Sequence, residues 1–317
     1  MSSPLVELGL LPWADVPYAE QLERKHEFLR QAFARRGMAV PVEPVRPSAR
    51  VVGARARVKL QSRGGRLGFF RPGTHELASA PLDDLARPEV VEAAQRIDAK
   101  DGEVELRSDG LRVVVHATAR CHGLPDVAIN GKVVAGDPTL RVDGLRVSPG
   151  SFYQVNLEAN RALVAHVDEV VRSVTPEALL DLYGGIGNLS RAASRRGTPI
   201  TVVEANAAAA ADARHNLPGA VVTTGDAGKY RPGSAVFDVA LLDPPRTGAP
   251  GVLVAVATTR PRAIVYVSCD PVTLARDVSS VTGGYDVVSV VPFDMFPGTD
   301  HVEVVCVLER ATRTSRR

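Results

Sequence analysis

Apolar and polar residues alternate with two different periods along this chain, and the period changes twice. Between residues 18 and 36, Leu22, Phe28, Leu29 and Phe33 approximate one face of an amphipathic helix, which Gly37 ends. From about residue 50 to 150 the apolar runs are short and separated by glycine turns, and beyond residue 150 strand and helix patterns take turns. We therefore expect an N-terminal helical segment (1–47), a mainly β domain (48–147) and an α/β domain (148–317).

The middle part reads as a small, mainly β domain. Residues 55–60 and 67–70 predict a hairpin around the Gly64-Gly65 turn. Residues 111–118 and 127–134 are further expected strands, and a polar stretch with helical character runs from 88 to 99.

The last part predicts an α/β fold with a doubly wound, mostly parallel sheet, because strands there are separated by helical patterns. Residues 157–174 form the first expected helix. The expected strands are Ala178–Leu182, Ile200–Glu204, Ala220–Thr224, Val236–Leu242, Ala263–Val267, Tyr285–Pro292 and His301–Leu308. The last two leave no room for a crossover helix, so we expect the last strand to pair antiparallel.

Composition indicates an ordinary soluble protein of the cytoplasm. The chain has 317 residues, 45% of them hydrophobic and 23% charged. No apolar run approaches the roughly 20 residues of a membrane span, and the start lacks the features of a signal peptide. Cys121, Cys269 and Cys306 are far apart and without metal-ligand spacing, which predicts a reducing compartment, no disulfide framework and no metal site.

A block of positive charge stands out against a net charge of only +2. Residues 46–71 contain no Asp or Glu and eight basic side chains: Arg46, Arg50, Arg55, Arg57, Lys59, Arg63, Arg66 and Arg71. Such a block is a candidate phosphate-binding face for RNA. It is equally typical of a solvated hairpin whose arginines serve solubility.

The stretch around Cys269 predicts a buried strand that runs directly into a helix. Residues 264–267 are β-branched, apolar or aromatic, Asp270 is a suitable N-cap, and Pro271 suits the first helical position. Cys269 would then face the positive end of a helix, which favours the nucleophilic thiolate. A small buried hydrophobe is the alternative use of this cysteine.

Four expected strands end in residues suited to a nucleotide-like ligand. The first ends at the glycine-rich turn 181–188, where Gly185 and Gly187 allow a ligand close to the backbone, although a dinucleotide would fit such a turn equally. The second ends in Glu204, suited to ribose hydroxyls, and the third near Asp226, suited to an adenine amino group. The fourth ends in the stiff Asp243-Pro244-Pro245-Arg246 loop.

These motifs resemble the S-adenosylmethionine-dependent RNA uracil-C5 methyltransferases. The resemblance is strongest from residue 148 to 309 and rests on five segments: 148–156 (SPGSFYQVN), 181–188 (DLYGGIGN), 243–248 (DPPRTG), 268–274 (SCDPVTL) and 294–303 (DMFPGTDHVE). It implies a Rossmann-like class I methyltransferase domain. It also implies donor contacts from Gln154, Tyr183, Asn188, Glu204, Asp226 and Asp243, Cys269 as nucleophile and Glu303 as general base.

The implied chemistry explains these residue types. Uracil C5 is too weak a nucleophile to take a methyl group unaided, and addition of the Cys269 thiolate to C6 makes C5 enolate-like. Glu303 then removes the C5 proton, and Arg246 beside the cysteine assists the thiolate. The expected substrate is a uridine in RNA, ribosomal in preference to transfer RNA. The expected RNA contacts are Arg246, Arg55, Arg57, Lys59 and Phe70, in a monomeric enzyme.

The chain departs from the family at four positions, of which Gly184 in place of a frequent Cys is expected to be harmless. Many members bind an iron–sulfur cluster through cysteines, whereas Leu8 and Leu11 stand here upstream of the matching Tyr18 and Gln21. We therefore expect no cluster and an apolar plug instead. Asp270 replaces the usual Asn, and its carboxylate beside the thiolate would raise the pKa of the thiol.

Two alternative functions stay open at this point. One is a methyltransferase acting on another atom, such as an exocyclic amine, although an aromatic residue usually follows the Asp/Asn-Pro-Pro of those enzymes. The other is an RNA-binding or RNA-folding factor without catalysis.

Overall fold

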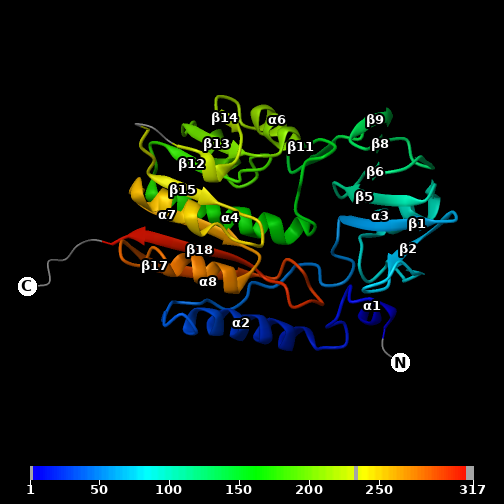
Figure 1. Cartoon of the computed structure of the whole chain (residues 1–317), viewed down its shortest axis with the longest axis horizontal. Helices are drawn as coiled ribbons and strands as arrows, with labels where there is room; N and C mark the ends of the chain where they lie inside the picture. Colours follow the sequence, from blue (N-terminus) through cyan, green and yellow to red (C-terminus); the bar gives the residue numbers. More distant parts are fainter. Residues whose placement is uncertain (1–2, 232–234, 312–317) are drawn as a thin grey trace, which may run out of the picture. The chain divides into compact units, whose positions relative to one another are not determined.

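The computed structural model describes residues 3–231 and 235–311, which form two compact units (Figure 1). The first unit comprises residues 1–21, 48–160 and 295–300, and the second comprises 22–47, 161–294 and 301–317. The N-terminal segment therefore divides between the two units.

The first unit is built on an antiparallel-rich sheet in the strand order β3-β2-β1-β5-β6-β8-β9, in which only the β6–β8 pair is parallel within the described residues. Two short antiparallel pairs complete it: β4 with β7, and the hairpin β10–β11. Its elements are α1 (Pro4–Glu7), β1 (Arg57–Arg63), β2 (Arg66–Phe70), β3 (Leu77–Ala78), α3 (Pro88–Arg96), β4 (Asp98–Ala99), β5 (Gly102–Ser108), β6 (Val113–Ala117), β7 (Cys121–His122), β8 (Val127–Ile129), β9 (Lys132–Ala135), β10 (Leu140–Val142) and β11 (Leu145–Val147).

The expected β character of this region and the hairpin around Gly64-Gly65 are confirmed. The single strand expected at 127–134 is wrong, because β8 and β9 form a second hairpin there. Asn130 and Gly131 both have positive φ, 49° and 76°. An Asn-Gly pair suits such a two-residue turn, so the signal was present in the sequence.

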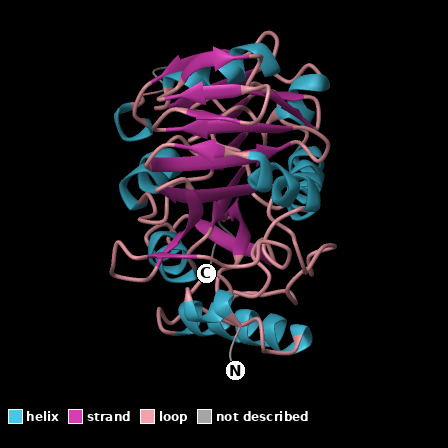
Figure 2. Cartoon of the chain, turned by 90° about the vertical axis from the view of Figure 1, so that its right-hand side faces the viewer, coloured by secondary structure: helices cyan, strands magenta, loops and turns pink. Residues whose placement is uncertain are grey.

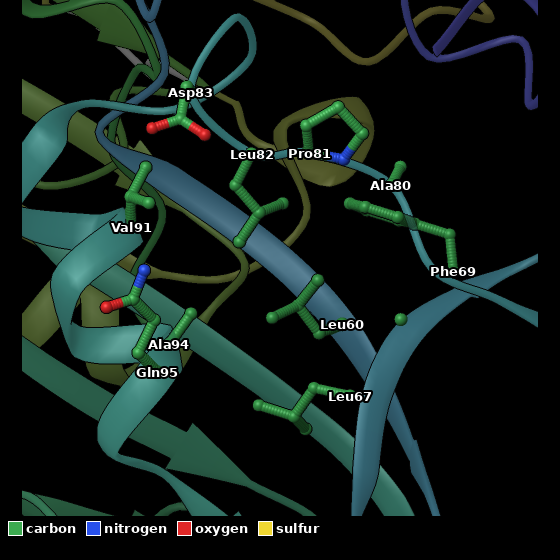
Figure 3. A pocket seen from close by; sticks show the side chains of 11 residues that line it. Leu60, Leu67, Phe69, Ala80, Pro81, Leu82, Asp83, Val91, Ala94 and Gln95 are labelled. Atoms are coloured by element: carbon green, nitrogen blue, oxygen red, sulfur yellow. The ribbon is translucent and has the colours of Figure 1, made fainter. Parts of the chain in front are cut away.

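Alternation of side chains along the strands gives this sheet one apolar face. Val58, Leu60, Val104 and Leu106 are buried there together with Val90 of α3. Leu60, Leu67 and Phe69 also line an apolar pocket of about 270 Å³ against Leu82 and Val91 (Figure 3). Of the two adjacent phenylalanines, Phe69 is therefore the one used for packing.

The second unit is a doubly wound sheet in the order β14-β13-β12-β15-β16-β18-β17. Neighbouring strands from β14 to β16 are parallel, and β18 is antiparallel to both β16 and β17, as the sequence predicts. Its elements are β12 (Leu179–Leu182), α5 (Arg191–Arg195), β13 (Ile200–Glu204), α6 (Ala207–Asn216), β14 (Val221–Thr224), the 3₁₀ helix η1 (Ala227–Lys229), β15 (Val239–Leu242), α7 (Pro250–Thr258), β16 (Ala263–Ser268), α8 (Pro271–Ser279), β17 (Tyr285–Phe293) and β18 (Glu303–Arg310).

Two long helices, α2 (Tyr18–Ala34) and α4 (Leu157–Val174), continue from the first unit's residues into the second's. The part of α2 in the second unit covers the β17 end of the sheet, and this helix is seen at the bottom of Figures 1 and 2. Leu29 and Phe33 of α2 pack into the core of the second unit. Residues 42–46 run beside β17 with isolated parallel bridges, so its outer edge is covered.

The described residues contain no helix that is both long and apolar enough to cross a membrane. The carboxyl ends of β12, β13, β15 and β16 lie at one edge of the second sheet, because these strands are parallel. In sheets of this kind ligands bind at that edge.

Candidate active site

The turn between β16 and α8 places Cys269 as the sequence predicts. Asp270 is the N-cap of α8, and its carboxylate accepts a hydrogen bond of 2.8 Å from the Thr273 amide. Pro271 occupies the start of the helix. Cys269 follows the last residue of β16 and is half-buried.

The thiol of Cys269 is harder to ionise than its position before a helix led us to expect. Burial raises its pKa to about 11, with the nearby Glu303 carboxylate as the next cause. Arg246 acts in the opposite direction through its charge and a hydrogen bond, as expected, but the other effects outweigh it. The free protein therefore holds Cys269 as a thiol at neutral pH.

Asp270 does not have the effect that we expected of a carboxylate in place of the usual Asn. The carboxyl groups that raise the pKa of Cys269 are Glu303 and Asp243. Asp270 instead accepts the amide of the first helical turn, a contact that stabilises a helix start by about 1 kcal/mol.

Glu303 is the first residue of β18 and lies directly across from Phe293 of β17. The next residue, Val304, pairs with Ser268, so the antiparallel register brings Glu303 to the same edge as Cys269. Glu303 is only 3% exposed. Burial and the Asp243 charge raise its pKa well above the ordinary value, while Arg246 opposes them. Such a buried, perturbed carboxyl is unlike a surface residue at a strand start.

Arg246 lies in an exposed position in the loop after β15. Its Nη2 is 3.0 Å from Nε2 of His301, which stands two residues before Glu303. His301 is part of the 294–303 segment, but no sequence pattern predicts a role for it. The Arg246 guanidinium thus interacts with Cys269, Glu303 and His301.

Three carboxyl groups gather at the neighbouring strand ends. Asp181 of β12 is fully buried, and in the described residues neither of its carboxylate oxygens has a hydrogen bond of good geometry, although the Ser190 hydroxyl is close enough to lower its pKa somewhat. Burial raises the pKa of Asp181 to about 7, and burial together with Asp181 and Glu204 raises the pKa of Asp243 to about 7. Glu204, at the end of β13, accepts the amides of Gly185 (2.9 Å) and Asn206 (2.6 Å).

The glycine-rich turn after β12 is open at Gly185 but filled at Gly187, where the sequence also predicts room for a ligand. Gly185 has φ +55°, and a Cβ there would meet no atom within 4 Å, which leaves room for a ligand. Gly187 has φ +86° and packs so closely on Leu217 that a Cβ would come within 2.6 Å. Tyr183 also has positive φ (59°), an unusual conformation for a side-chain-bearing residue and one that clusters at functional sites.

Asp226 follows β14 and caps η1, accepting the Gly228 amide at 2.8 Å. Asn188 ends the glycine-rich segment 181–188, in the same unit as Asp226. Gln154 belongs to the first unit, just before α4.

Known proteins resemble this chain over most of its length. An uncharacterised RNA methyltransferase from Thermotoga maritima is 31% identical over 95% of this chain and 82% of that protein. The tRNA (Uracil-5-)-methyltransferase family profile matches residues 232–311. The chain belongs to the RNA uracil-C5 methyltransferase family.

Two further relatives of this uracil-C5 methyltransferase have named substrates. The 23S rRNA (uracil(1939)-C(5))-methyltransferase of Tolumonas auensis is 38% identical over 54% of this chain, but the match spans only 42% of that protein. The solved tRNA (uracil-54, C5)-methyltransferase of Pyrococcus abyssi, in complex with S-adenosyl-L-homocysteine, has a TM-score of 0.76 and 26% identity over 97% of this chain and 87% of that one. The fold of the methyltransferase is therefore the class I methyltransferase fold with a β-rich N-terminal region, and its methyl donor is S-adenosylmethionine.

The carboxylate cluster of the methyltransferase fits this donor, which carries a sulfonium cation, an ammonium group and ribose hydroxyls. The buried Asp181 lacks a hydrogen bond of good geometry from the described residues, and Asp243 is raised in pKa by its carboxyl neighbours, so both gain from a positive ligand. The open backbone at Gly185 allows that ligand to approach.

The iron–sulfur expectation stays a prediction for this methyltransferase. Leu8 and Leu11 are 7% and 8% exposed and belong to the apolar core of the first unit. Within residues 3–231 and 235–311, no three His, Cys, Asp or Glu side chains are grouped to hold a metal ion.

Proposed function

We propose that this enzyme methylates C5 of a uridine in RNA through a covalent bond between Cys269 and C6 of the base. The arrangement that carries the proposal is the meeting of Cys269, Glu303 and Arg246 at one sheet edge, next to the Asp181–Glu204–Asp243 carboxylates. A methyltransferase that acts directly on an amine would need no thiol there.

The reaction begins when Cys269 releases its proton to solvent and its sulfur forms a bond with C6. The electron pair of the C5–C6 double bond moves toward C5 and O4, and C5 takes the methyl group from the sulfonium, which leaves a neutral thioether. Glu303 then takes the C5 proton, the C5–C6 double bond re-forms, and the Cys269 thiolate leaves with its electron pair.

In this proposal, the raised pKa values of Cys269 and Glu303 keep both groups protonated until the substrates bind. Cys269 and Glu303 both face negative charge, and Asp243 contributes to each shift. A cationic methyl donor beside Asp243 offsets that charge and lowers both pKa values. Binding of the donor thus favours both the Cys269 thiolate and the ionised Glu303 carboxylate.

The polar face of the sheet in the first unit is the proposed RNA-binding surface. A cleft of about 390 Å³ opens there, lined among others by Arg57, His116, Asn130 and Phe152. The Arg57 guanidinium lies 4.7 Å from the centre of the Phe152 ring, and Phe152 is 54% exposed. Exposed aromatic rings beside arginine suit unpaired bases of single-stranded RNA.

The other expected RNA contacts differ in how accessible they are. Arg55 donates a 3.1 Å hydrogen bond to the Leu10 carbonyl inside the first unit, which favours a structural role. Lys59 pairs with Glu103 of β5 at 2.9 Å, so this face mixes both charges. Phe70 lies edge-on to His75 with the Arg63 guanidinium over its ring, and it stays half-buried.

We further propose ribosomal RNA as substrate, in a monomeric cytoplasmic enzyme. The 23S rRNA enzyme that is 38% identical over 54% of the chain supports ribosomal RNA, and the scattered free cysteines support a reducing compartment.

Mapping of 5-methyluridine in total RNA, with and without this gene, tests the proposal. We expect one ribosomal uridine to lose its methyl group when the gene is deleted. The Cys269→Ala enzyme should not restore it, yet should bind the donor as the unchanged enzyme does. A methylated amine in place of 5-methyluridine, or restoration by Cys269→Ala, would contradict the proposal.

A further inference from the structure

A fully buried ion pair joins helix α2 to the segment that leads into β18. The Lys25 ammonium lies 2.5 Å from Oδ1 of Asp294, and both side chains are 0% exposed. The two residues are 269 positions apart in the chain. Burying two charges is costly in free energy, and apolar residues often stabilise a fold equally well, so such a pair indicates a need for specific geometry.

Asp294 stands beside the residue that faces the general base. It follows Phe293, the direct cross-strand partner of Glu303. Glu303 is the first residue of its strand, so no earlier pair in β18 fixes its position. The orientation of the Glu303 carboxylate therefore depends on how firmly the end of β17 is held.

A second contact fixes the same strand end from the outer edge. The amide of Asp294 donates to the Arg46 carbonyl (2.9 Å), and the amide of Arg46 donates to the Pro292 carbonyl (2.8 Å). The Arg46 guanidinium also lies 5.2 Å from the centre of the Phe293 ring. These contacts hold the backbone of Asp294, while the buried ion pair with Lys25 holds its side chain.

We propose that Lys25 is a positioning residue for the general base. Its ammonium holds Asp294, and through it the end of β17, in the register that directs the Glu303 carboxylate to the C5 proton of the target uridine. The inference rests on the proposed function of Glu303. Proton removal from C5 is sensitive to displacement of the base by about 1 Å, whereas attack by Cys269 depends on a different strand end.

The test separates adduct formation from elimination. In the double variant Lys25→Met/Asp294→Leu both charges of the buried pair are replaced by apolar side chains. We expect a melting temperature and a donor affinity close to those of the unchanged enzyme, and a kcat about tenfold lower with an unchanged KM for RNA. A Cys269–RNA adduct should accumulate on denaturing gels.

The exposed ion pair Arg196–Asp168 supplies the matched control, because it lies in the same unit at 2.6 Å. Its double variant, Arg196→Met/Asp168→Leu, should change neither kcat nor the amount of adduct. A folded Lys25→Met/Asp294→Leu enzyme with unchanged kcat and no adduct would overturn the inference.

Two further variants keep the test decisive. If the apolar double variant does not fold, Asp294→Asn keeps the shape and an oxygen acceptor for Lys25 while weakening the attraction. The same increase in Cys269–RNA adduct is expected in this variant. An unchanged ratio of adduct to released product would overturn the inference. Glu303→Gln serves as the reference for trapped adduct. Absence of adduct in that variant would refute the role of Glu303 itself, which is a different failure.

Discussion

At the scale of single residues, Cys269 combines two opposed demands. A free thiolate would react with cellular electrophiles, yet the proposed reaction needs a thiolate at the moment of attack. Burial and Glu303 keep the thiol protonated, and Arg246 is the side chain that favours the thiolate. The reactivity of Cys269 is therefore set by neighbours that are distant in sequence.

Replacing Arg246 with Gln should raise the pKa of Cys269 further above about 11, because the hydrogen bond and the positive charge are both lost. A hydrogen bond to a charged group contributes about 1.5–3 kcal/mol, so adduct formation should slow by roughly 10- to 100-fold. The rate of iodoacetamide labelling of Cys269, followed by mass spectrometry between pH 7 and 10.5, measures the shift. Cys306 is the internal control, since burial raises its pKa to about 12. An unchanged labelling profile would show that Arg246 does not act on the thiol.

Replacing Glu303 with Gln should trap the enzyme on RNA. The amide keeps the size of the side chain but cannot take the C5 proton, so the methylated adduct cannot eliminate Cys269. A denaturing gel with labelled RNA and S-adenosylmethionine should show a slowly migrating, protease-sensitive band that is missing in Cys269→Ala. Full turnover by Glu303→Gln would assign the base to another residue.

The residue scale also shows what local sequence can and cannot predict. The cap at Asp270 and the position of Cys269 follow from a few adjacent residues, because helix starts are local structures. The burial of Glu303 depends on pairing with β17 and on Asp243, so only the family resemblance pointed to it. No local pattern distinguishes His301 as the partner of Arg246.

At the scale of elements, helix α8 fixes the loop that carries Arg246. The Asp277 carboxylate of α8 accepts hydrogen bonds from the Ala249 amide and the Tyr266 hydroxyl, both at 2.7 Å. Arg276 donates to the Thr247 carbonyl at 2.8 Å. Gly248 approaches so closely that a Cβ would lie 2.4 Å from Asp277 Oδ2, which explains glycine at this position. The loop is therefore held rigid before any substrate binds.

Replacing Tyr266 with Phe should destabilise this arrangement, because Tyr266 is fully buried and donates to a charged group. The expected loss is about 1.5–3 kcal/mol of unfolding free energy, measured by urea denaturation. Tyr285→Phe makes the same chemical change in the same sheet, where the hydroxyl donates to the neutral Pro261 carbonyl at 2.8 Å. It should cost only about 1 kcal/mol. Equal losses in the two variants would contradict the importance of the Asp277 charge.

Long amphipathic elements were predicted more closely than short ones. The expected helix at 157–174 agrees with α4 at both ends, since its apolar stripe spans several turns. The expected strand at 127–134 fails because apolar residues flank the Asn130-Gly131 turn on both sides, and apolar content alone does not show the reversal. Turn-forming pairs have to be weighed before the hydrophobic pattern.

At the scale of the molecule, each of the two units is built from three segments that are separate in the sequence. Sequence patterns change near residues 48 and 148, but residues 22–47 belong to the same unit as 161–294. This assignment arises because α2 and residues 42–46 cover the β17 edge of the sheet. Contacts between residues so far apart leave no periodic signal in the sequence.

The carboxylate cluster makes the whole second unit sensitive to pH. The pKa values of Asp181 and Asp243 are about 7, above the ordinary value of about 3.9 for an unfolded chain. The folded protein therefore binds more protons than the unfolded one between about pH 4 and 7. Their contribution to stability consequently falls as the pH rises through this window, and it is lowest above pH 7.

A cationic donor should reverse this loss, because it favours the ionised carboxylates. We expect the increase in melting temperature at a fixed S-adenosylmethionine concentration to be larger at pH 8, where Asp181 and Asp243 are mostly ionised, than at pH 6. S-adenosylhomocysteine carries the same amino acid and ribose but a neutral sulfur. The increase in melting temperature that it causes should therefore grow less between pH 6 and pH 8. In the Asp243→Asn variant, the two ligands should differ less in how their increase in melting temperature depends on pH. Equal pH dependence for both ligands would mean that the carboxylate cluster does not respond to the sulfonium charge.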